Sequence, residues 1–290
     1  MENRLSIGTA QFGMAYGVAN QKGQIAQGAA REILSRGWDA GIRMMDTAIA
    51  YGDSESRLGE IGLDKWRVVT KIPRFANDNK NVAESIDNLI RGSLDRLRIP
   101  RLYAVLLHYP EQLLEDSGSA IFDALRTARE LGMVEKIGVS IYDPEMLPAI
   151  MGRFELDLVQ APFNLIDRRL VTSGWLSRLH AAGVEVHVRS TFLQGLLLMN
   201  IADRPAKFDR WKPLWIKWQT WLNSNQTSAV AACLNFNLSH SEINRVIVGI
   251  DSPEHLSEIL EAATMSTDCA APNIESNDLD LINPTRWASL

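Results

Sequence analysis

The chain has 290 residues, of which 46% are hydrophobic, and it carries a formal net charge of -5 at pH 7. This composition provides a large buried core and excludes a disordered chain, while the acidic balance and the dispersed Lys and Arg residues argue against nucleic acid as a partner. No apolar run is long enough to cross a membrane, and residues 1–10 predict a strand rather than a cleaved signal, so we expect a cytoplasmic protein with no membrane partner.

Short apolar runs, typical of strands covered on both faces, alternate along the chain with longer helical patterns. The runs predict strands at Leu5–Thr9, Ile42–Asp46, Arg67–Lys71, Leu102–His108, Lys136–Ser140, Leu156–Gln160, Val184–Arg189 and Arg245–Gly249. The helical patterns lie at Ala29–Ala40, Ser54–Ile61, Asn81–Leu97, Ala120–Leu131, Pro144–Met151, Leu170–Ala182 and Pro253–Ala263.

This strict alternation predicts a parallel sheet, and eight such units in a chain of this length favour a closed (β/α)8 barrel. No Gly-x-Gly-x-x-Gly follows the first predicted strand, which weakens the alternative of an open dinucleotide-binding sheet. No linker rich in Pro, Gly or Ser interrupts the pattern. We therefore predict one domain over residues 1–290.

A long segment, residues 193–241, separates the seventh and eighth predicted strands. Its tryptophans are spaced by four, three and three residues and so share one helical face: Trp211, Trp215, Trp218 and Trp221. We interpret them as a packing stripe, with the alternative that Trp211 or Trp215 lines a substrate pocket. The tail from about residue 270 is polar and weakly patterned, so it either wraps the barrel or is mobile.

The two cysteines, Cys233 and Cys269, form neither a Cys-x-x-Cys pair nor part of a metal-ligand cluster. A disulfide scaffold and a metal site are therefore not expected, and the cysteine usage fits a reducing compartment. Cys233 lies within an apolar run, so we interpret it as a small, inert core residue.

Polar residues stand where the apolar strands end. The second to seventh predicted strands end in Asp46, Lys71, His108, Ser140, Gln160 and Arg189-Ser190, in that order. The carboxyl ends of barrel strands converge on one face, where catalytic groups lie. A buried Asp-Lys pair or a single core histidine is as often structural as functional, but the recurrence of polar residues at the same place favours a site.

Tyr51 follows Asp46 closely enough for its loop to bring the phenol over the same face. A free tyrosine has a pKa of about 10, and we expect the Lys71 ammonium to lower it, with Asp46 holding Lys71 charged. His108 is placed to donate a hydrogen bond to a carbonyl oxygen. This set can protonate an oxyanion as it forms, but it contains no Ser-His or Cys-His pair and no set of metal ligands. Reduction of a carbonyl also needs a hydride, which side chains cannot supply and a nicotinamide cofactor can.

Four segments resemble the aldo-keto reductase family in order and spacing. They are Gly8-Thr-Ala-Gln-Phe-Gly13, Gly41-Ile-Arg-Met-Met-Asp46-Thr-Ala-Ile-Ala-Tyr51-Gly52, Val68-Val-Thr-Lys71 and Val105-Leu-Leu-His108. The resemblance implies a (β/α)8 barrel that uses NAD(P)H. It also implies that Tyr51 is the general acid, that Lys71 and Asp46 tune it, and that His108 orients and polarises the substrate.

The resemblance further implies cofactor contacts at Thr9, Ala10, Ser140, Gln160, Arg189, Ser190, Gly249, Ser252, His255 and Glu258. The chain departs from the family pattern at Ile141 and Ile259, which replace Asn, and at Gly249 and His255, which replace basic residues. Recognition of a 2′-phosphate usually relies on Arg or Lys. No clear 2′-phosphate site is therefore expected, and the cofactor is either NADPH or NADH, with no strong preference for NADPH.

The expected partner is a small carbonyl or sugar-like molecule. Arg189, together with Arg168 and Arg169, would suit an anionic substrate, whereas structural pairing of Arg168 and Arg169 is the alternative. Two other functions remain open: a nicotinamide-binding regulatory or partner-binding barrel with little turnover, and an isomerase or dehydratase that uses the nicotinamide transiently.

Overall fold

The structure, a computed structural model, describes residues 3–20, 22–75, 81–265 and 270–290. Its strands pair in parallel and in chain order, and β1 also pairs with β8, so the sheet closes into a barrel. The predicted fold class is therefore confirmed. The strands are β1 (Leu5–Gly8), β2 (Met44–Asp46), β3 (Arg67–Ile72), β4 (Leu102–Leu107), β5 (Val134–Ser140), β6 (Leu158–Pro162), β7 (Glu185–Arg189) and β8 (Arg245–Gly249).

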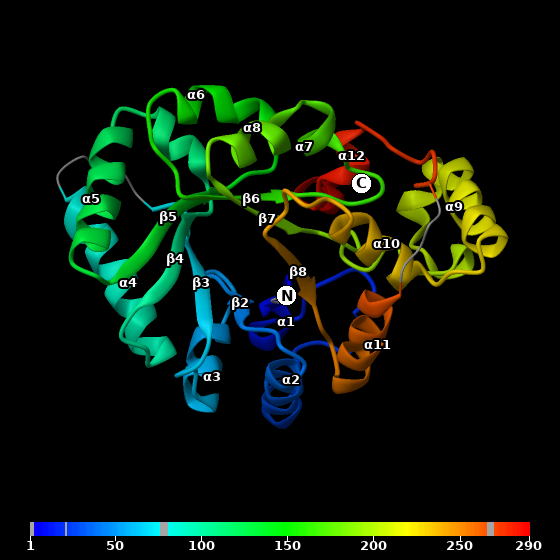
Figure 1. Ribbon diagram of the computed structural model, residues 1–290, viewed down its shortest axis with the longest axis horizontal. Helices are drawn as coiled ribbons and strands as arrows, with labels where there is room; N and C mark the ends of the chain where they lie inside the picture. Colours follow the sequence, from blue (N-terminus) through cyan, green and yellow to red (C-terminus); the bar gives the residue numbers. More distant parts are fainter. Residues whose placement is uncertain (1–2, 21, 76–80, 266–269) are drawn as a thin grey trace.

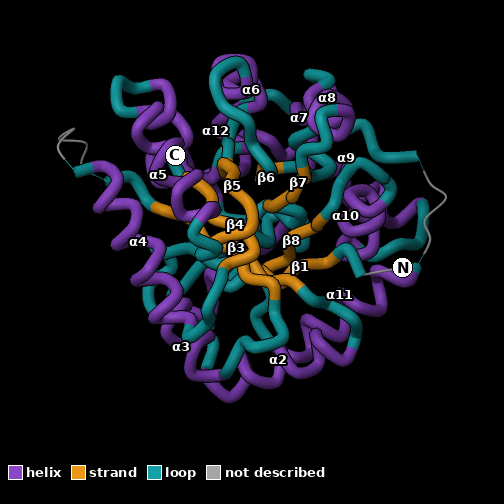
Figure 2. The backbone as a smooth tube through the Cα atoms, turned by 60° about the vertical axis from the view of Figure 1, so that its left-hand side comes forward, coloured by secondary structure: helices purple, strands orange, loops and turns teal. Residues whose placement is uncertain are grey.

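Helices surround the strands, which gather at the centre of the molecule (Figures 1 and 2). The α-helices are α1 (Ala10–Gly13), α2 (Gln27–Asp39), α3 (Ser54–Ile61), α4 (Val82–Leu97), α5 (Gly118–Glu130), α6 (Leu147–Met151), α7 (Arg169–Thr172), α8 (Trp175–Ala181), α9 (Lys212–Ser224), α10 (Ala229–Leu238), α11 (Pro253–Thr264) and α12 (Leu279–Ile282). Short 3-10 helices lie at Pro110–Leu114, Pro144–Met146, Ile201–Asp203, Ala206–Trp211 and Pro284–Ser289.

Two predicted helices differ from the structure for local reasons. The helix predicted over 170–182 is two helices, α7 and α8, because Gly174 between them adopts a positive φ of 76° that an α-helix cannot contain. The helix predicted over 144–151 begins as a 3-10 turn, and only Leu147–Met151 is α-helical. The sixth strand runs from Leu158 to Pro162, two residues later than predicted at both ends.

The segment 193–241 contains α9 and α10, and α9 lies at the outer edge of the molecule (Figure 1). The indole N–H of Trp215 donates to Phe208 O at 3.0 Å, and that of Trp218 donates to Leu197 O at 2.9 Å. Both rings are buried. Trp211 donates instead to Asp278 in the C-terminal segment. The tryptophans therefore pack the segment, as the interpretation of a packing stripe expects.

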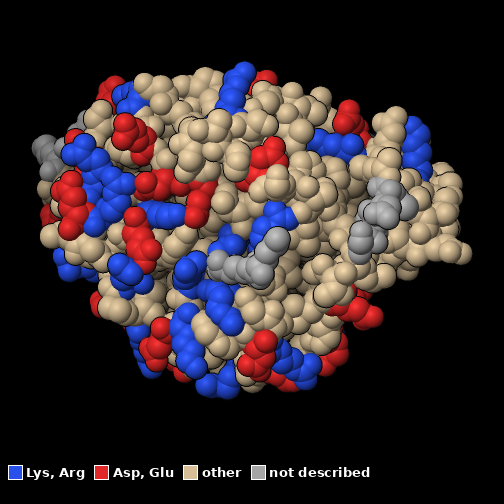
Figure 3. Space-filling model, viewed as in Figure 1, with Lys and Arg blue, Asp and Glu red and all other residues tan. Residues whose placement is uncertain are grey.

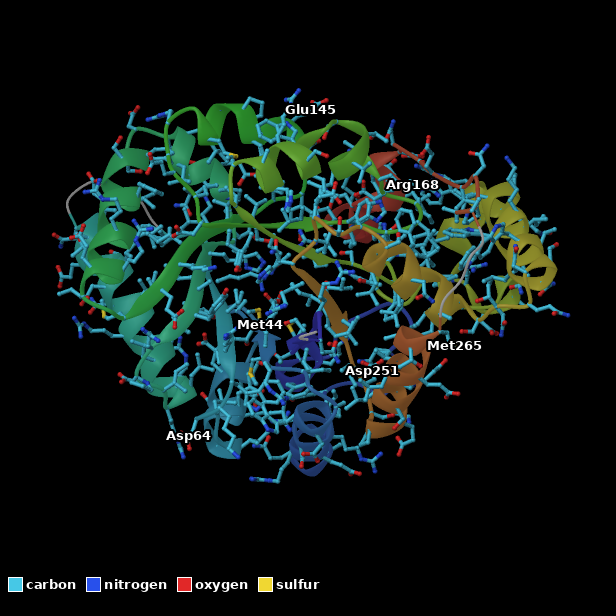
Figure 4. The ribbon with its side chains drawn as sticks, in the orientation of Figure 1. Met44, Asp64, Glu145, Arg168, Asp251 and Met265 are labelled. Atoms are coloured by element: carbon cyan, nitrogen blue, oxygen red, sulfur yellow. The ribbon has the colours of Figure 1, made fainter. Side chains whose placement is uncertain are left out.

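The described part of the tail wraps the barrel. Ser276 N donates to Ile166 O at 2.9 Å, and the Arg168 guanidinium donates to Pro272 O at 2.6 Å. Arg168 accordingly lies beside the C-terminal segment (Figure 4). Trp287 is buried near the end of the chain. Of the two cysteines, Cys233 is buried and its burial raises the pKa of the thiol, as expected of an inert core residue; Cys269 lies outside the described residues.

An apolar layer fills the middle of the barrel and supports the face where the strands end. Met44, Val69, Ala104, Leu106 and Leu158 form this layer, and each is at most 1% exposed (Figure 4 labels Met44). Below it, at the other end of the strands, Glu185 accepts hydrogen bonds from Tyr103 and Lys136. The barrel is thus a packed core with ionic groups at both ends, and not a pore.

The surface mixes charges of both signs. On the face drawn in Figure 3, basic and acidic side chains are interspersed, and the right-hand part around α9 shows mostly uncharged atoms. Within the described residues, no helix combines the length and apolarity that a membrane span requires.

Candidate active site

A buried ion pair stands at the carboxyl ends of β2 and β3. The Lys71 ammonium lies 2.6 Å from Asp46 Oδ2 and donates to Thr47 O at 2.9 Å. The other Asp46 oxygen, Oδ1, accepts a hydrogen bond of 2.7 Å from the amide of Gln160 at the end of β6. Burial lowers the pKa of Lys71, which is fully buried, and the Asp46 carboxylate opposes that shift. Three strand ends are thereby joined in one network.

Tyr51 and His108 lie beside this pair, so the structure brings together the four residues predicted to be catalytic. The Lys71 ammonium is 5.0 Å from the centre of the Tyr51 ring. The Tyr51 and His108 rings meet edge to face, with 6.1 Å between their centres. A phenol, an ammonium, a carboxylate and an imidazole therefore share one end of the barrel.

Close backbone contacts hold the Tyr51 loop in place. A Cβ atom at Gly13, the last residue of α1, would overlap the carbonyl oxygen of Tyr51 and would lie 2.5 Å from Ser54 N. Gly52 has a φ of 57°, and a Cβ there would overlap Gly13 O. Only glycine fits at either position, so the two loops are locked together. The sequence interpretation did not identify this role, although both glycines lie in the segments that carried the family resemblance.

The electrostatics of Tyr51 correct the sequence-based expectation. Burial and the Asp46 carboxylate raise the pKa of the Tyr51 phenol, and Arg189 is the positive group that opposes them. The expectation that Lys71 lowers this pKa is therefore wrong, because the Lys71 charge is matched by Asp46 at 2.6 Å. A hydroxyl that stays protonated is suited to donating a proton.

His108 is neutral at pH 7. Burial, together with the positive charges of Lys71 and Arg189, lowers its pKa to about 4. Its Nδ1 atom is buried and has no hydrogen-bond partner among the described residues. A neutral imidazole next to a phenol can donate one hydrogen bond without bringing a further charge into the site.

Polar groups behind the site fix the strands that carry it. Thr9, directly after β1, donates its hydroxyl to Asp46 O at 3.0 Å, and Ser54 Oγ donates to Thr9 O at 3.0 Å. Buried Glu55 accepts from Thr70 at 2.6 Å and from Arg96 at 2.8 Å, which ties α3 to β3 and α4. Sequence reasoning missed Glu55, because its partners lie far from it along the chain.

Several of the residues predicted to hold the nicotinamide end contact one another or a neighbouring strand end. Ser140 Oγ is 3.4 Å from Gln160 Oε1, and both residues are buried. The Arg189 guanidinium donates to Ile141 O at 3.1 Å and to Ser190 Oγ at 3.3 Å, and lies over the Tyr142 ring at 4.3 Å. Arg189 therefore reaches across from β7 to the end of β5.

The residues predicted to hold the adenosine end lie at a different place, after β8. Gly249 ends β8, and Ser252 caps α11 by accepting a hydrogen bond of 3.2 Å from His255 N. Glu258 lies one turn further along the same helix, and Ala10, the other predicted contact, is buried at the start of α1. In the closed ring, β8 is separated from the Tyr51 loop only by β1.

Arg168 and Arg169 do not serve the site. Arg169 binds Asp167 at 2.9 Å and Asp143 at 3.2 Å. Arg168 donates to Leu165 O and to Pro272 O. Structural pairing, the alternative left open by the sequence, accounts for both residues.

Three further tyrosines surround the site and were not predicted. Tyr109 packs beside His108, with 5.7 Å between ring centres, and is 48% exposed. Tyr16, also exposed, accepts a hydrogen bond of 3.1 Å from Gln194, which lies in the loop after β7. Although 39% of the Tyr16 surface is exposed, partial burial of its phenol, together with the nearby Tyr51 and Tyr142 phenols, raises the pKa of Tyr16 to about 12. Tyr16 and Tyr142 thus lie close enough to act on the Tyr51 phenol, and Tyr109 packs against His108.

The family model that describes the aldo/keto reductase family matches residues 4–271. The chain belongs to the aldo/keto reductase family. Its relatives include the D-threo-aldose 1-dehydrogenase of Pseudomonas sp, 25% identical over 90% of this chain and 92% of that protein. The 2,5-diketo-D-gluconic acid reductase B of a Corynebacterium is 34% identical over 39% of this chain and 41% of its own.

Solved structures show the same fold. The holo form of an aldo-keto reductase from Bacillus halodurans superposes with a TM-score of 0.73 at 20% identity, covering 92% of this chain and 88% of that one. A glycerol dehydrogenase from Gluconobacter oxydans gives a TM-score of 0.71 at 20% identity, with the same coverage. This aldo/keto reductase is an oxidoreductase, and its family uses NAD(P)H.

Proposed function

We propose that this aldo/keto reductase interconverts a carbonyl and an alcohol, with Tyr51 as the general acid. The observation that carries the proposal is the meeting of Tyr51, His108 and the Lys71–Asp46 pair at one end of the barrel. Such a set delivers a proton to an oxygen atom as negative charge develops on it. In the reduction, the carbonyl oxygen gains this proton and the carbonyl carbon gains a hydride.

Each residue has a distinct part in the proposed reaction. The raised pKa of Tyr51 keeps its hydroxyl protonated until an alkoxide, a stronger base than phenolate, forms beside it. Neutral His108 donates a hydrogen bond to the carbonyl oxygen and orients it. The Lys71–Asp46 pair adds a nearby ammonium without adding net charge. Reversal of the reaction requires the Tyr51 phenolate and is therefore favoured by high pH.

The residues present fit a nicotinamide dinucleotide. Two buried polar atoms at this face have no partner among the described residues: His108 Nδ1, after β4, and Asp251 Oδ1, after β8. These strands stand on opposite sides of the ring, so a dinucleotide beside β8 and a carbonyl substrate beside His108 would together cover both places. Ser140 and Gln160 would hold the nicotinamide amide, and Ser252 and Glu258 the adenosine end. When bound, the nicotinamide supplies the hydride.

For the substrate, we propose a small polyhydroxylated carbonyl compound of the aldose type. Two relatives are named for the oxidation of an aldose and for the reduction of a diketo sugar acid. In this chain, Tyr16 and Tyr109 offer exposed rings and hydroxyl groups beside the site. Aromatic faces and hydroxyls suit the apolar faces and the hydroxyl groups of a sugar.

The test is deuterium transfer. The protein is incubated with NADH or NADPH deuterated at the hydride position and with a panel of aldoses and simple aldehydes. The expected result is loss of reduced-nicotinamide absorbance together with deuterium at the former carbonyl carbon. Substrate conversion without net oxidation of the nicotinamide would point to an isomerase or dehydratase. Tight binding of the dinucleotide without any conversion would favour the regulatory barrel.

Placement of the Tyr51 loop is testable through Gly13. Gly13→Ala is expected to lower kcat about tenfold to a hundredfold, because the added methyl group pushes the Tyr51 backbone away from its position. It should also lower the free energy of unfolding by about 1–3 kcal/mol, the usual range for overpacking. Steady-state kinetics and urea unfolding provide the two measurements.

Gly28→Ala is the matched control, because nothing lies within 4 Å of a Cβ at this helical position. It should leave kcat unchanged and raise stability slightly, since alanine favours a helix. Equal behaviour of the two variants would contradict the proposed locking of the loops.

A further inference from the structure

We propose that a cavity at the amino-terminal end of the barrel binds a small organic anion, a carboxylate with an apolar body, at a second site remote from Tyr51. The cavity has a volume of about 710 Å³, which lies within the range of roughly 300–1,000 Å³ that is common for small-molecule sites. This inference goes beyond the proposed function, because the second site requires neither a dinucleotide nor turnover.

The cavity lies where β1 and β8 begin, beside the C-terminal end of α11. The two strands pair in parallel, and α11 packs between α2 and α10 (Figures 1 and 2). Arg4 precedes β1 and Arg245 begins β8, and both line the cavity. Tyr51 and His108, in contrast, follow the carboxyl ends of β2 and β4. The cavity and the candidate active site therefore lie at opposite ends of the barrel.

Apolar side chains provide a surface for the body of the ligand. Leu238 ends α10, Ile243 precedes β8, and Leu260 and Ala263 lie in the last turns of α11. Ile243 is buried, whereas the other three are partly buried and pack against the core. Apolar groups that are only partly covered favour an apolar ligand that removes the rest of their surface from water.

Two guanidinium groups determine the charge of the ligand. Arg4 and Arg245 both line the cavity, and the described residues that line it include no Asp or Glu. Burial and the charge of Arg245 lower the pKa of Arg4, so the two groups lie close enough to repel each other. An anion beside them relieves this repulsion and gains charge-assisted hydrogen bonds. The cavity therefore favours a negatively charged head group.

Arg4 retains hydrogen-bond donors for this head group. Its Nη1 group donates to His240 O at 2.9 Å and to Ile243 O at 3.0 Å, and its Nη2 group donates to Leu238 O. A guanidinium has five N–H groups, so Nε–H and one Nη2–H of Arg4 have no acceptor among the described residues. Two N–H groups match the two oxygens of one carboxylate. The same bonds neutralise carbonyl groups at the end of α10 that would otherwise repel an anion.

Binding is measured by isothermal titration calorimetry of the protein without a dinucleotide, using octanoate, octanamide and octylammonium as probes. These molecules share a chain length and differ in charge. Octanoate is expected to bind at least about tenfold more tightly than octanamide, and octylammonium is not expected to bind. Arg4→Gln should weaken octanoate binding about tenfold or more by removing a charge. Ala263→Phe should do so by filling the cavity, and it keeps the test valid if Arg4→Gln fails to fold.

Arg126→Gln is the matched control, because it removes the same charge from an exposed position on α5. This variant should bind octanoate as the unmodified protein does. Octanoate binding that is absent or no tighter than octanamide binding would overturn the inference, and so would binding that neither Arg4→Gln nor Ala263→Phe weakens. None of these outcomes depends on Tyr51, so the proposed function is tested separately.

Discussion

Replacing Tyr51 with Phe is expected to lower kcat for carbonyl reduction by about 10²–10⁴-fold, the usual contribution of a positioned general acid. Only the hydroxyl is lost, because the Phe ring can keep the edge-to-face contact with His108 and the position 5.0 Å from the Lys71 ammonium. The free energy of unfolding and the Kd for the dinucleotide should therefore change little. Steady-state kinetics at saturating cofactor, with fluorescence titration alongside, separate these effects.

Tyr103→Phe serves as the control for this substitution. It removes the same hydroxyl from the opposite end of the barrel, where Tyr103 binds Glu185 at 2.8 Å. Its kcat should stay close to that of the unmodified enzyme, although some stability is lost with the hydrogen bond. If the kcat of Tyr51→Phe were as high as that of Tyr103→Phe, Tyr51 would not be the general acid.

Lys71→Met is expected to affect both stability and catalysis. The Lys71 side chain is fully buried, and its removal leaves the Asp46 carboxylate in the core with Gln160 as its one side-chain donor among the described residues. Breaking one side of a buried ion pair typically lowers the free energy of unfolding by about 3–5 kcal/mol. We also expect kcat to fall, since Tyr51 loses the nearby ammonium. Chemical denaturation followed by tryptophan fluorescence measures the first effect.

A surface ion pair just after β3, the strand that carries Lys71, serves as the comparison for Lys71→Met. Arg74 binds Glu115 at 2.5 Å, but both side chains are substantially exposed. Arg74→Met should therefore change stability by less than about 1 kcal/mol. In the double variant Lys71→Met with Asp46→Asn, part of the lost stability should return while activity stays low. If Lys71→Met were as mild as Arg74→Met, the buried pair would not have the energetic role assigned to it.

The fold was predictable because its signals are local and repeated. Apolar runs of strand length alternate with helical patterns, and the second to seventh of these runs end in a polar residue. Since parallel strands in a barrel end on one face, Asp46, Lys71, His108 and Gln160 were expected to converge, and they do. The helix α10 was not predicted, because its sequence is apolar on nearly all sides and lacks a helical period.

The properties of the site that were not predicted depend on contacts between distant parts of the chain. The pKa of Tyr51 is governed by how deeply the ring is buried and by the Asp46 charge, neither of which a motif reveals. The partners of Arg169 include Asp143, from another loop. The lock between Gly13 and Tyr51 likewise joins two loops that only the closed barrel brings together.

The packed interior of the barrel determines how the site exchanges molecules with its surroundings. Met44, Val69, Ala104, Leu106 and Leu158 fill it beneath Lys71 and Asp46, and buried Ser6 and His187 lie in β1 and β7 of the same barrel. Because the interior is a packed core and not a pore, the product must leave by the opening through which the substrate entered. Each turnover therefore has to clear that opening before the next can begin.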